Sequence, residues 1–276
     1  DCHAKHATQS SVWPTSPTYP RNVPTLCGQC HRVGETVAKR IGADVDDIVG
    51  SYEESVHGRA LITAGLIVSA TCADCHGAHS ELPTDDPRSL TNAQHIADTC
   101  GTCHHGIEEE FRTSIHWTDQ PDSDQERPTW EDCHASHTIS RADKPGFRTR
   151  MMEQCGHCHI VQAETFFDTF HGKVSRLGGE GVAKCYDCHG THNILPPTEP
   201  ASMLSRDNVV ETCGACHEGS HRRFAGYLTH ATHHDRDRYP YLFWSFWGMT
   251  ALLVGTLTFA FLHTMAWLVR LWLNRD

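Results

Sequence analysis

The spacing of cysteine and histidine constrains this chain more than any other feature. Its 276 residues include 14 cysteines and 23 histidines, and the pattern Cys-x-x-Cys-His occurs six times. The six motifs are Cys27, Cys30 and His31; Cys72, Cys75 and His76; Cys100, Cys103 and His104; Cys155, Cys158 and His159; Cys185, Cys188 and His189; and Cys213, Cys216 and His217. Whatever these motifs bind determines how the chain folds.

The two remaining cysteines stand in the same context. Cys2 is followed directly by His3, and the first cysteine of that motif would lie before residue 1. Cys133 is followed by His134, with Trp130 where the first cysteine would be. We count eight sites, six of them with a complete motif.

The motif indicates covalent haem attachment. Two thiols one helical turn apart can bond the two vinyl groups of a porphyrin while the adjacent histidine coordinates the iron. Structural zinc sites and disulfide frameworks also use paired cysteines, but neither explains a histidine after the second cysteine in every copy. We expect eight c-type haems, with the haem at Cys133 held by a single thioether.

The sites alternate between two kinds, which indicates an internal repeat. One kind reads Asp-Cys-His-x-x-His and ends at His6, His79, His137 and His192; the other reads Cys-Gly-x-Cys-His. The interval from the trailing histidine to the next Cys-Gly-x-Cys-His motif is 21 residues in three cases and 18 between His137 and Cys155. Four two-haem modules follow from this alternation.

Candidate sixth ligands equal the haems in number. They are the four trailing histidines, His6, His79, His137 and His192, and four that recur between modules, His57, His116, His171 and His230. Residues three apart on a helix share one face, so a trailing histidine must serve a different haem from its own motif. We expect His57, His116 and His171 to serve the haems at Cys72, Cys133 and Cys185. The first haem then needs a ligand upstream of residue 1, and His230 is either a spare or a ligand elsewhere.

The haems themselves are expected to form the core. Only 38% of the residues are hydrophobic, below the roughly 45–50% of ordinary globular domains. The predicted fold is mainly irregular with short α-helices, including 106–116 and 160–177, with Thr91 and Ser205 as N-caps and no strand pattern. Residues 1–238 form the octahaem domain and residues 239–276 a transmembrane helix with a short tail.

The membrane segment is a run of 29 uncharged residues from Tyr241 to Val269. About 20 residues suffice to cross a bilayer. Tryptophans mark both ends, and positive charges follow the run: Trp244, Trp247, Trp267, Trp272, Arg270 and Arg275. This pattern favours an inner-membrane anchor with a cytoplasmic C-terminus and the haem domain on the periplasmic side.

His263 lies inside that run. An ionisable residue at membrane depth is either a ligand, here to a b-type haem, or a group hydrogen-bonded to a neighbouring helix, and both readings stay open. The segment Leu262-His263-Thr264-x-x-Trp267-x-x-Arg270 resembles the first helix of dihaem b-type cytochrome subunits that exchange electrons with quinone. That resemblance implies further helices, from a partner subunit or from sequence beyond Asp276.

The region 1–234 resembles multihaem cytochromes built on doubled Cys-x-x-Cys-His motifs. The resemblance implies an electron-transfer subunit of an oxidoreductase complex rather than an enzyme, with no catalytic residue of its own. Its implied partners are a membrane, a b-type cytochrome or other quinone-linked subunit, and a soluble or extracellular redox protein on the periplasmic side. The net charge of −11 argues against a nucleic-acid partner.

Two alternatives remain from the sequence. A multihaem reductase or oxidase acting on a small nitrogen or sulfur compound would need an iron with an open sixth position. Such enzymes often carry lysine in place of the motif histidine, and no Cys-x-x-Cys-Lys occurs here. A storage role for the haems has the same sequence signature as a conduit and differs only in its kinetics.

Overall fold

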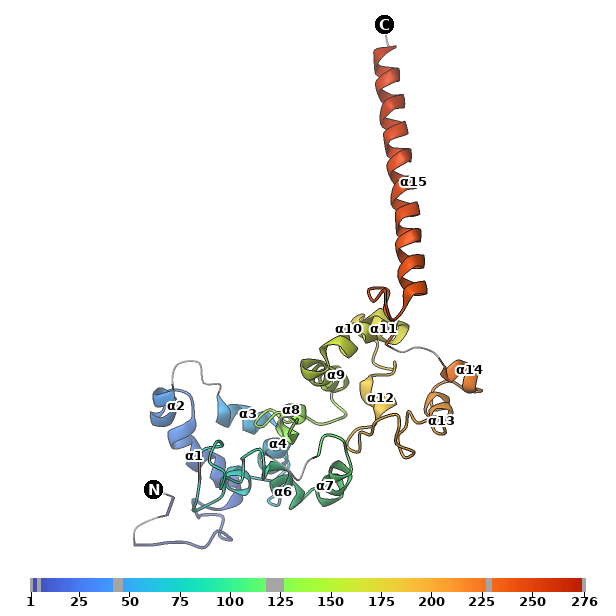
Figure 1. Cartoon of the computed structure of the whole chain (residues 1–276). Helices are drawn as coiled ribbons and strands as arrows, with labels where there is room; N and C mark the ends of the chain where they lie inside the picture. The colour runs from blue at the N-terminus through green and yellow to red at the C-terminus, as the bar shows by residue number, and fades with distance from the viewer. Residues whose placement is uncertain (1, 4–5, 42–46, 118–126, 227–229, 275–276) are drawn as a thin grey trace. The chain divides into compact units, whose positions relative to one another are not determined.

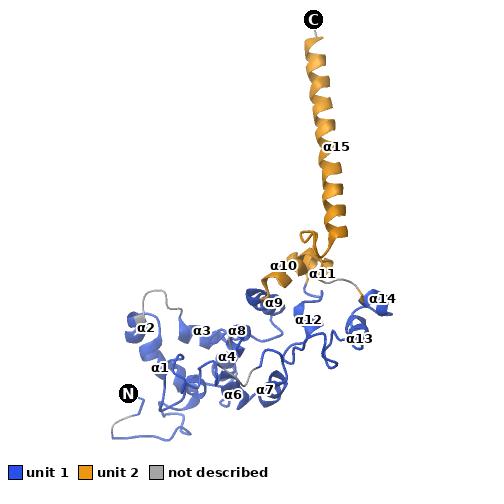
Figure 2. Ribbon diagram, in the orientation of Figure 1, with its two compact units in different colours: residues 1–158, 180–225 blue, residues 159–179, 226–276 orange. Residues whose placement is uncertain are grey.

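The computed structural model describes residues 2–3, 6–41, 47–117, 127–226 and 230–274 (Figure 1). Asp1, Arg275 and Asp276 lie outside the described residues. The chain divides into two compact units (Figure 2). Unit 1 comprises residues 1–158 and 180–225, and unit 2 comprises residues 159–179 and 226–276.

Unit 1 is built from short helices joined by long irregular segments. Its elements are η1 (Pro20–Asn22), α1 (Val23–His31), α2 (Thr36–Ile41), α3 (Ile48–Glu54), α4 (Val56–Ile62), α5 (Cys72–His76), α6 (Ile96–Gly101), α7 (His105–Arg112), α8 (Trp130–His134), α9 (Phe147–Cys158), α12 (Cys185–His189), α13 (Val209–Gly214) and α14 (Arg222–Ala225). Unit 2 holds α10 (Ile160–Asp168), α11 (Phe170–Arg176) and α15 (Pro240–Leu273). No strand occurs among the described residues, so the predicted short-helix fold is confirmed at this level.

Several predicted helix bounds are wrong. The helix expected over 106–116 ends at Arg112, and the one expected over 160–177 is two helices divided at Thr169. Thr169 has an extended backbone and caps the second helix, which stops the first one from continuing. Thr91 and Ser205 do not cap helices, because α6 and α13 begin later and have His95 and Asn208 in the cap position.

Few hydrophobic side chains are buried. Within the described residues the buried hydrophobic set is Val23, Ala38, Val49, Leu61, Ala97, Met152 and Phe166, and the buried polar or charged residues are twice as numerous. A core this small contributes little burial energy, since each fully buried aliphatic or aromatic side chain supplies about 1.5–3 kcal/mol. Aliphatic packing therefore does not account for the fold of unit 1.

A serine-centred loop explains the 21-residue interval. Ser16, Ser89 and Ser202 are buried, and each hydroxyl donates to a carbonyl seven residues earlier, at 3.2–3.3 Å. An asparagine closes each loop by donating from Nδ2 to a carbonyl eight residues earlier; these are Asn22, Asn92 and Asn208. The 18-residue interval lacks this serine and asparagine and instead forms α9, of 12 residues, so the length difference between intervals is a difference in structure.

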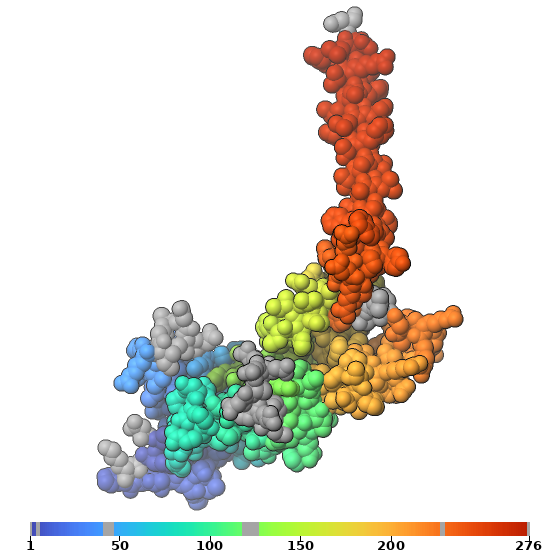
Figure 3. Space-filling view, viewed as in Figure 1, coloured from blue at the N-terminus to red at the C-terminus, as the bar shows by residue number. Residues whose placement is uncertain are grey.

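The α15 helix has 34 residues; its most apolar 18-residue stretch has a mean hydropathy of 1.8, and none of that stretch is buried. At 1.5 Å per residue it is roughly 50 Å long, more than the roughly 30 Å of a bilayer's hydrocarbon core. Among the described residues it is the one helix long and apolar enough to cross a membrane. On the face that the space-filling view shows, no other segment covers the helix beyond its base (Figure 3).

Candidate haem sites

The aspartate of each of the three Asp-Cys-His motifs after residue 70 caps a five-residue helix. The Asp74 carboxylate accepts from the Thr71 backbone N–H at 2.7 Å and from the Thr71 hydroxyl at 2.6 Å. Asp132 makes the same two bonds with Thr129, at 2.6 and 2.8 Å. Asp187 accepts from the backbone N–H of Lys184 at 2.7 Å. These capping bonds hold the thiols and histidine of α5, α8 and α12 on one short helix.

This role of the aspartates was not predicted, although the sequence contains a signal for it. Two of the three helices begin with Thr-x-x-Asp, and that pattern is typical of a capping box. The residue after the motif histidine of α5, α8 and α12 has a positive φ: Gly77 (86°), Ala135 (62°) and Gly190 (88°). Ala135, with ψ of 173°, occupies a region that essentially only glycine adopts without strain.

The two kinds of site differ in exposure. In the Cys-Gly-x-Cys-His motifs the second cysteine and the histidine are exposed: Cys30, His31, Cys103, His104, Cys158, His159, Cys216 and His217. In the described Asp-Cys-His motifs that follow residue 70, the cysteines and histidines are half-buried: Cys72, Cys75, His76, Cys133, His134, Cys185, Cys188 and His189. Cys2, His3 and His6 are exposed. Exposure therefore alternates along the repeat from α1 onward.

Four motif histidines each face a candidate sixth ligand. The ring centres of His3 and His79 are 6.3 Å apart, and those of His57 and His104 are 6.2 Å apart. For His76 and His137 the separation is 6.0 Å with ring planes 7° apart, and for His134 and His192 it is 6.1 Å. An imidazole nitrogen binds a first-row metal at about 2 Å, so two rings on opposite sides of one iron have centres roughly 6 Å apart.

The ring pairs differ from two expectations. The ring of His57 lies near that of His104, and the ring near His76 is that of His137, whereas we expected His57 to serve the site at Cys72. The ring opposite His134 is that of His192 rather than His116.

Each paired trailing histidine instead faces the motif histidine of the preceding Asp-Cys-His copy. This is the case for His79, His137 and His192. The prediction that His171 serves the site at Cys185 stays a prediction.

Backbone hydrogen bonds interlock the repeats in the same register. The residue before His57 donates its N–H to the carbonyl of Ile139 at 2.8 Å. The residue before His116 donates in the same way to Ile194, also at 2.8 Å. Ile139 and Ile194 each lie two residues after a trailing histidine, so a between-module histidine and a later trailing histidine are fixed by one contact.

A tight turn between two helices, called here a corner, lies just before His57, and a second one lies just before His171. Ser55 caps α4 by accepting from the Gly58 N–H at 3.1 Å, and Thr169 caps α11 by accepting from the Gly172 N–H at 3.2 Å. A Cβ at Gly58 or Gly172 would overlap a carbonyl oxygen of the preceding helix. The sequence Ser/Thr-x-His-Gly therefore encodes a tight corner with the histidine in the first turn of the new helix.

His230 is held by its Nδ1 atom. This nitrogen lies 3.1 Å from both the Gln162 carbonyl oxygen and the Thr165 hydroxyl. Donation to the carbonyl fixes the tautomer with its lone pair on Nε2, which is the arrangement that second-shell partners give to metal-binding histidines. His230 is therefore oriented like a ligand rather than like a spare surface residue.

Burial favours the neutral, metal-binding form of several candidate ligands. Loss of solvation is the first cause that lowers the pKa of His57, His76, His134, His137, His192 and His230. Loss of solvation also raises the pKa of the Cys75, Cys100, Cys133 and Cys188 thiols. Neutral imidazole is the form that coordinates a metal.

The motif helices of unit 1 contact one another in series. The order is α1, α5, α6, α8, α9, α12 and α13, with each helix contacting the next. Thiols of different motifs meet at the junctions: Cys27 and Cys72 share a hydrogen bond that lowers the pKa of Cys27, and Cys155 and Cys185 share another. Seven motifs thus form one continuous row.

Unpartnered polar atoms lie beside two of the motifs. The buried Tyr186 Oη, Arg148 Nε and Trp130 Nε1 have no hydrogen-bond partner. Arg148 also pairs with Asp187, at 2.6 Å, and its guanidinium lies 5.5 Å from the centre of the Tyr186 ring. Buried polar atoms are nearly always satisfied in folded proteins, and carboxylates of a porphyrin would suit a guanidinium, a phenol and an indole N–H.

Other predicted positions lie outside these clusters. His263 is exposed on α15, with its ring 6.1 Å from that of Phe259.

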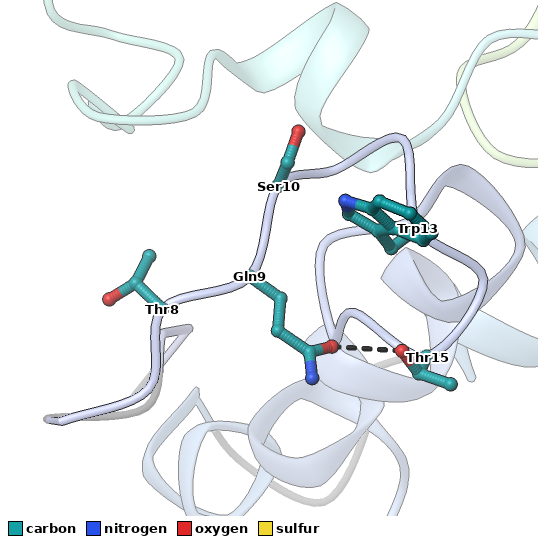
Figure 4. Close-up of a pocket in the computed structure, with 5 residues that line it drawn as sticks. All are labelled: Thr8, Gln9, Ser10, Trp13 and Thr15. Carbon is teal, nitrogen blue, oxygen red and sulfur yellow. Dashed lines mark hydrogen bonds between the residues drawn. The ribbon is translucent and has the colours of Figure 1, made fainter.

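A hollow before α1 is lined by Thr8, Gln9, Ser10, Trp13 and Thr15, with a 3.0 Å hydrogen bond from Thr15 to Gln9 (Figure 4). None of these five lining residues is a cysteine or a histidine.

Comparisons with known proteins give no relative. No protein-family model matches the chain, and neither the curated proteins nor the solved structures include a significant match.

Proposed function

We propose that this chain is a membrane-anchored multihaem c-type cytochrome that passes electrons along a row of haems. The observation that carries the proposal is the set of four histidine pairs with ring centres 6.0–6.3 Å apart, each joining a motif histidine to a candidate sixth ligand. Neither a zinc site nor a disulfide framework requires imidazoles to face each other at that separation.

The haem-binding residues follow from the motifs and pairs. The fourteen cysteines would supply thioether bonds to eight haems, six through two bonds and the haems at Cys2 and Cys133 through one within this sequence. When bound, each haem supplies a one-electron redox centre whose potential depends on its ligands, hydrogen bonds and exposure. Bis-histidine ligation lacks the methionine that raises potentials, so low potentials are expected.

The protein's own contribution would be to fix the order of the sites. The row of motif helices from α1 to α13 keeps each attachment point next to the following one. Asp74, Asp132 and Asp187 hold the short helices, and the corner at Gly58 holds a distal histidine. Conduction along the row therefore requires no large movement of unit 1.

The long apolar helix supports a role at a membrane. We propose that α15 anchors the chain in the inner membrane, with the haem-bearing part on the periplasmic side and the C-terminus in the cytoplasm. The partners would be a b-type cytochrome or other quinone-linked subunit and a soluble or extracellular redox protein. His263 is the candidate ligand for a b-type haem if a partner supplies the facing residue.

The test is the haem content and spin state of the chain purified from bacterial membranes. The expected result is about eight covalently bound haems per chain and absorption typical of low-spin iron with two histidine ligands. A colourless chain, or one containing zinc in place of iron, would refute the proposal. A high-spin signal that shifts with nitrite or hydroxylamine would favour the reductase alternative.

A further inference from the structure

Unit 2 contains a cluster of metal-binding side chains that the haem motifs do not use. Asp168 is the last residue of α10, and His233 and His234 lie in the segment that leads into α15. One ligand atom from each of the three lies within 4.8 Å of the other two. The sequence motifs give no reason for these residues to meet, because 65 positions separate Asp168 from His233.

The cluster is supported by neighbours that fix two of its members. The Thr232 hydroxyl donates to Asp168 Oδ2 at 3.2 Å, and His233 Nδ1 lies 3.9 Å from the same oxygen. The His233 ring also lies against the Phe246 ring of α15, with centres 3.8 Å apart, and against the His234 ring at 3.9 Å. Asp168 and His233 are half-buried, and His234 is exposed.

We propose that Asp168, His233 and His234 form a binding site for a divalent transition-metal ion. Two imidazoles and one carboxylate suit borderline ions such as Zn²⁺, whereas Mg²⁺ and Ca²⁺ prefer all-oxygen sites. Three protein ligands leave at least one position for water. The partly exposed site is accessible from solvent through His234.

Such an ion would join two parts of unit 2 that already meet through the hydrogen bonds of His230 and Thr232 to α10. It would tie the end of α10, which precedes the His171 corner, to the segment entering α15. Metal binding would therefore stiffen the base of the long helix. The site does not depend on electron transfer, so it can stand or fall independently of the proposed function.

The test uses the full haem-loaded chain in detergent and Zn²⁺ as the probe. After equilibrium dialysis against dilute zinc, metal analysis should give about one zinc per chain in the wild type. Asp168→Asn, His233→Ala and His234→Ala should each weaken zinc binding by at least about tenfold, and Thr232→Val by a smaller factor. Asp237→Asn and His221→Ala serve as controls that remove one carboxylate or one exposed imidazole elsewhere.

Three results would overturn the site. They are an absence of zinc in the wild type, equal binding in wild type and cluster variants, and equal losses in cluster and control variants. The haem absorption of every variant is measured alongside, and His233→Gln replaces any variant that loses haem. A chain that binds haem but no zinc would refute the metal site alone, whereas a chain without haem would refute the proposed function.

Discussion

Unit 1 and the α15 helix differ in their hydrophobic side chains. Unit 1 has few buried hydrophobic side chains and many buried serines and threonines, whereas α15 is strongly apolar and leaves its residues uncovered. Neither arrangement is stable in water by side-chain packing alone. In both, the chain is shaped for a non-protein neighbour, which we propose is porphyrin for unit 1 and lipid for α15.

The largest expected effect comes from removing the haem supply. Expression in cells unable to attach c-type haem should leave unit 1 unfolded, because its own core is too small to hold it. The α15 segment should remain helical in the membrane. Limited proteolysis of isolated membranes measures both, and a protease-resistant unit 1 without haem would contradict the comparison.

A charge in α15 tests its side of the comparison. Leu257 is 62% exposed in the middle of the helix, and Leu257→Arg should cost about 3 kcal/mol of membrane insertion. Val68→Arg is the control, since Val68 is 79% exposed in unit 1 and its replacement should change stability by under about 0.5 kcal/mol. The fraction of chain that resists alkaline extraction from membranes is the measurement; equal extraction of both variants would count against a spanning helix.

The corner at His57 gives a smaller effect confined to unit 1. Gly58→Ala should destabilise the protein by about 2 kcal/mol, because the added Cβ meets the Tyr52 carbonyl, and should convert one haem from low to high spin. Gly106→Ala is the matched control, because Gly106 is also helical and has open space around it. Denaturant unfolding followed by haem absorption measures both effects, and identical behaviour of the two variants would show that the corner is not needed.

The smallest effect is expected at Ala135. Ala135→Gly should stabilise unit 1 by about 1 kcal/mol because it relieves a backbone conformation that only glycine readily adopts. Ala60→Gly inside α4 should instead destabilise by about 0.5–1 kcal/mol. Paired thermal unfolding curves should shift in opposite directions, and shifts of the same sign would contradict the assignment of strain to Ala135.

The repeat could be predicted from the sequence, but the pairing of histidines could not. Motif spacing correctly indicated short helices and distinguished the 18-residue interval from the others. It did not indicate that the His57 ring lies near that of His104, because ring neighbours depend on which repeats pack together. The hydrogen bond from Val56 to Ile139 is one such contact, and it joins residues far apart in sequence. The break at Thr169 was missed because a capping threonine inside an apolar run looks like an ordinary helical residue.

The metal-binding cluster was hidden from the sequence for a similar reason. Adjacent histidines at positions 233 and 234 resemble an ordinary polar linker until the end of α10 brings a carboxylate to them. The role of the aspartates in the Asp-Cys-His motifs, by contrast, was readable from the capping pattern with Thr71 and Thr129.

Under the proposed function, the alternation of exposed and half-buried motifs would have an electrochemical consequence. Water stabilises the more highly charged oxidation state of a centre more strongly than a low-dielectric surrounding does, so exposure lowers a potential and burial raises it. The exposed Cys-Gly-x-Cys-His sites and the half-buried Asp-Cys-His sites would therefore titrate as two groups of midpoints. An electron moving along the row would pass between haems of alternately higher and lower potential. The net free energy of its transfer would depend on the potentials of the first and last haems and not on those between them.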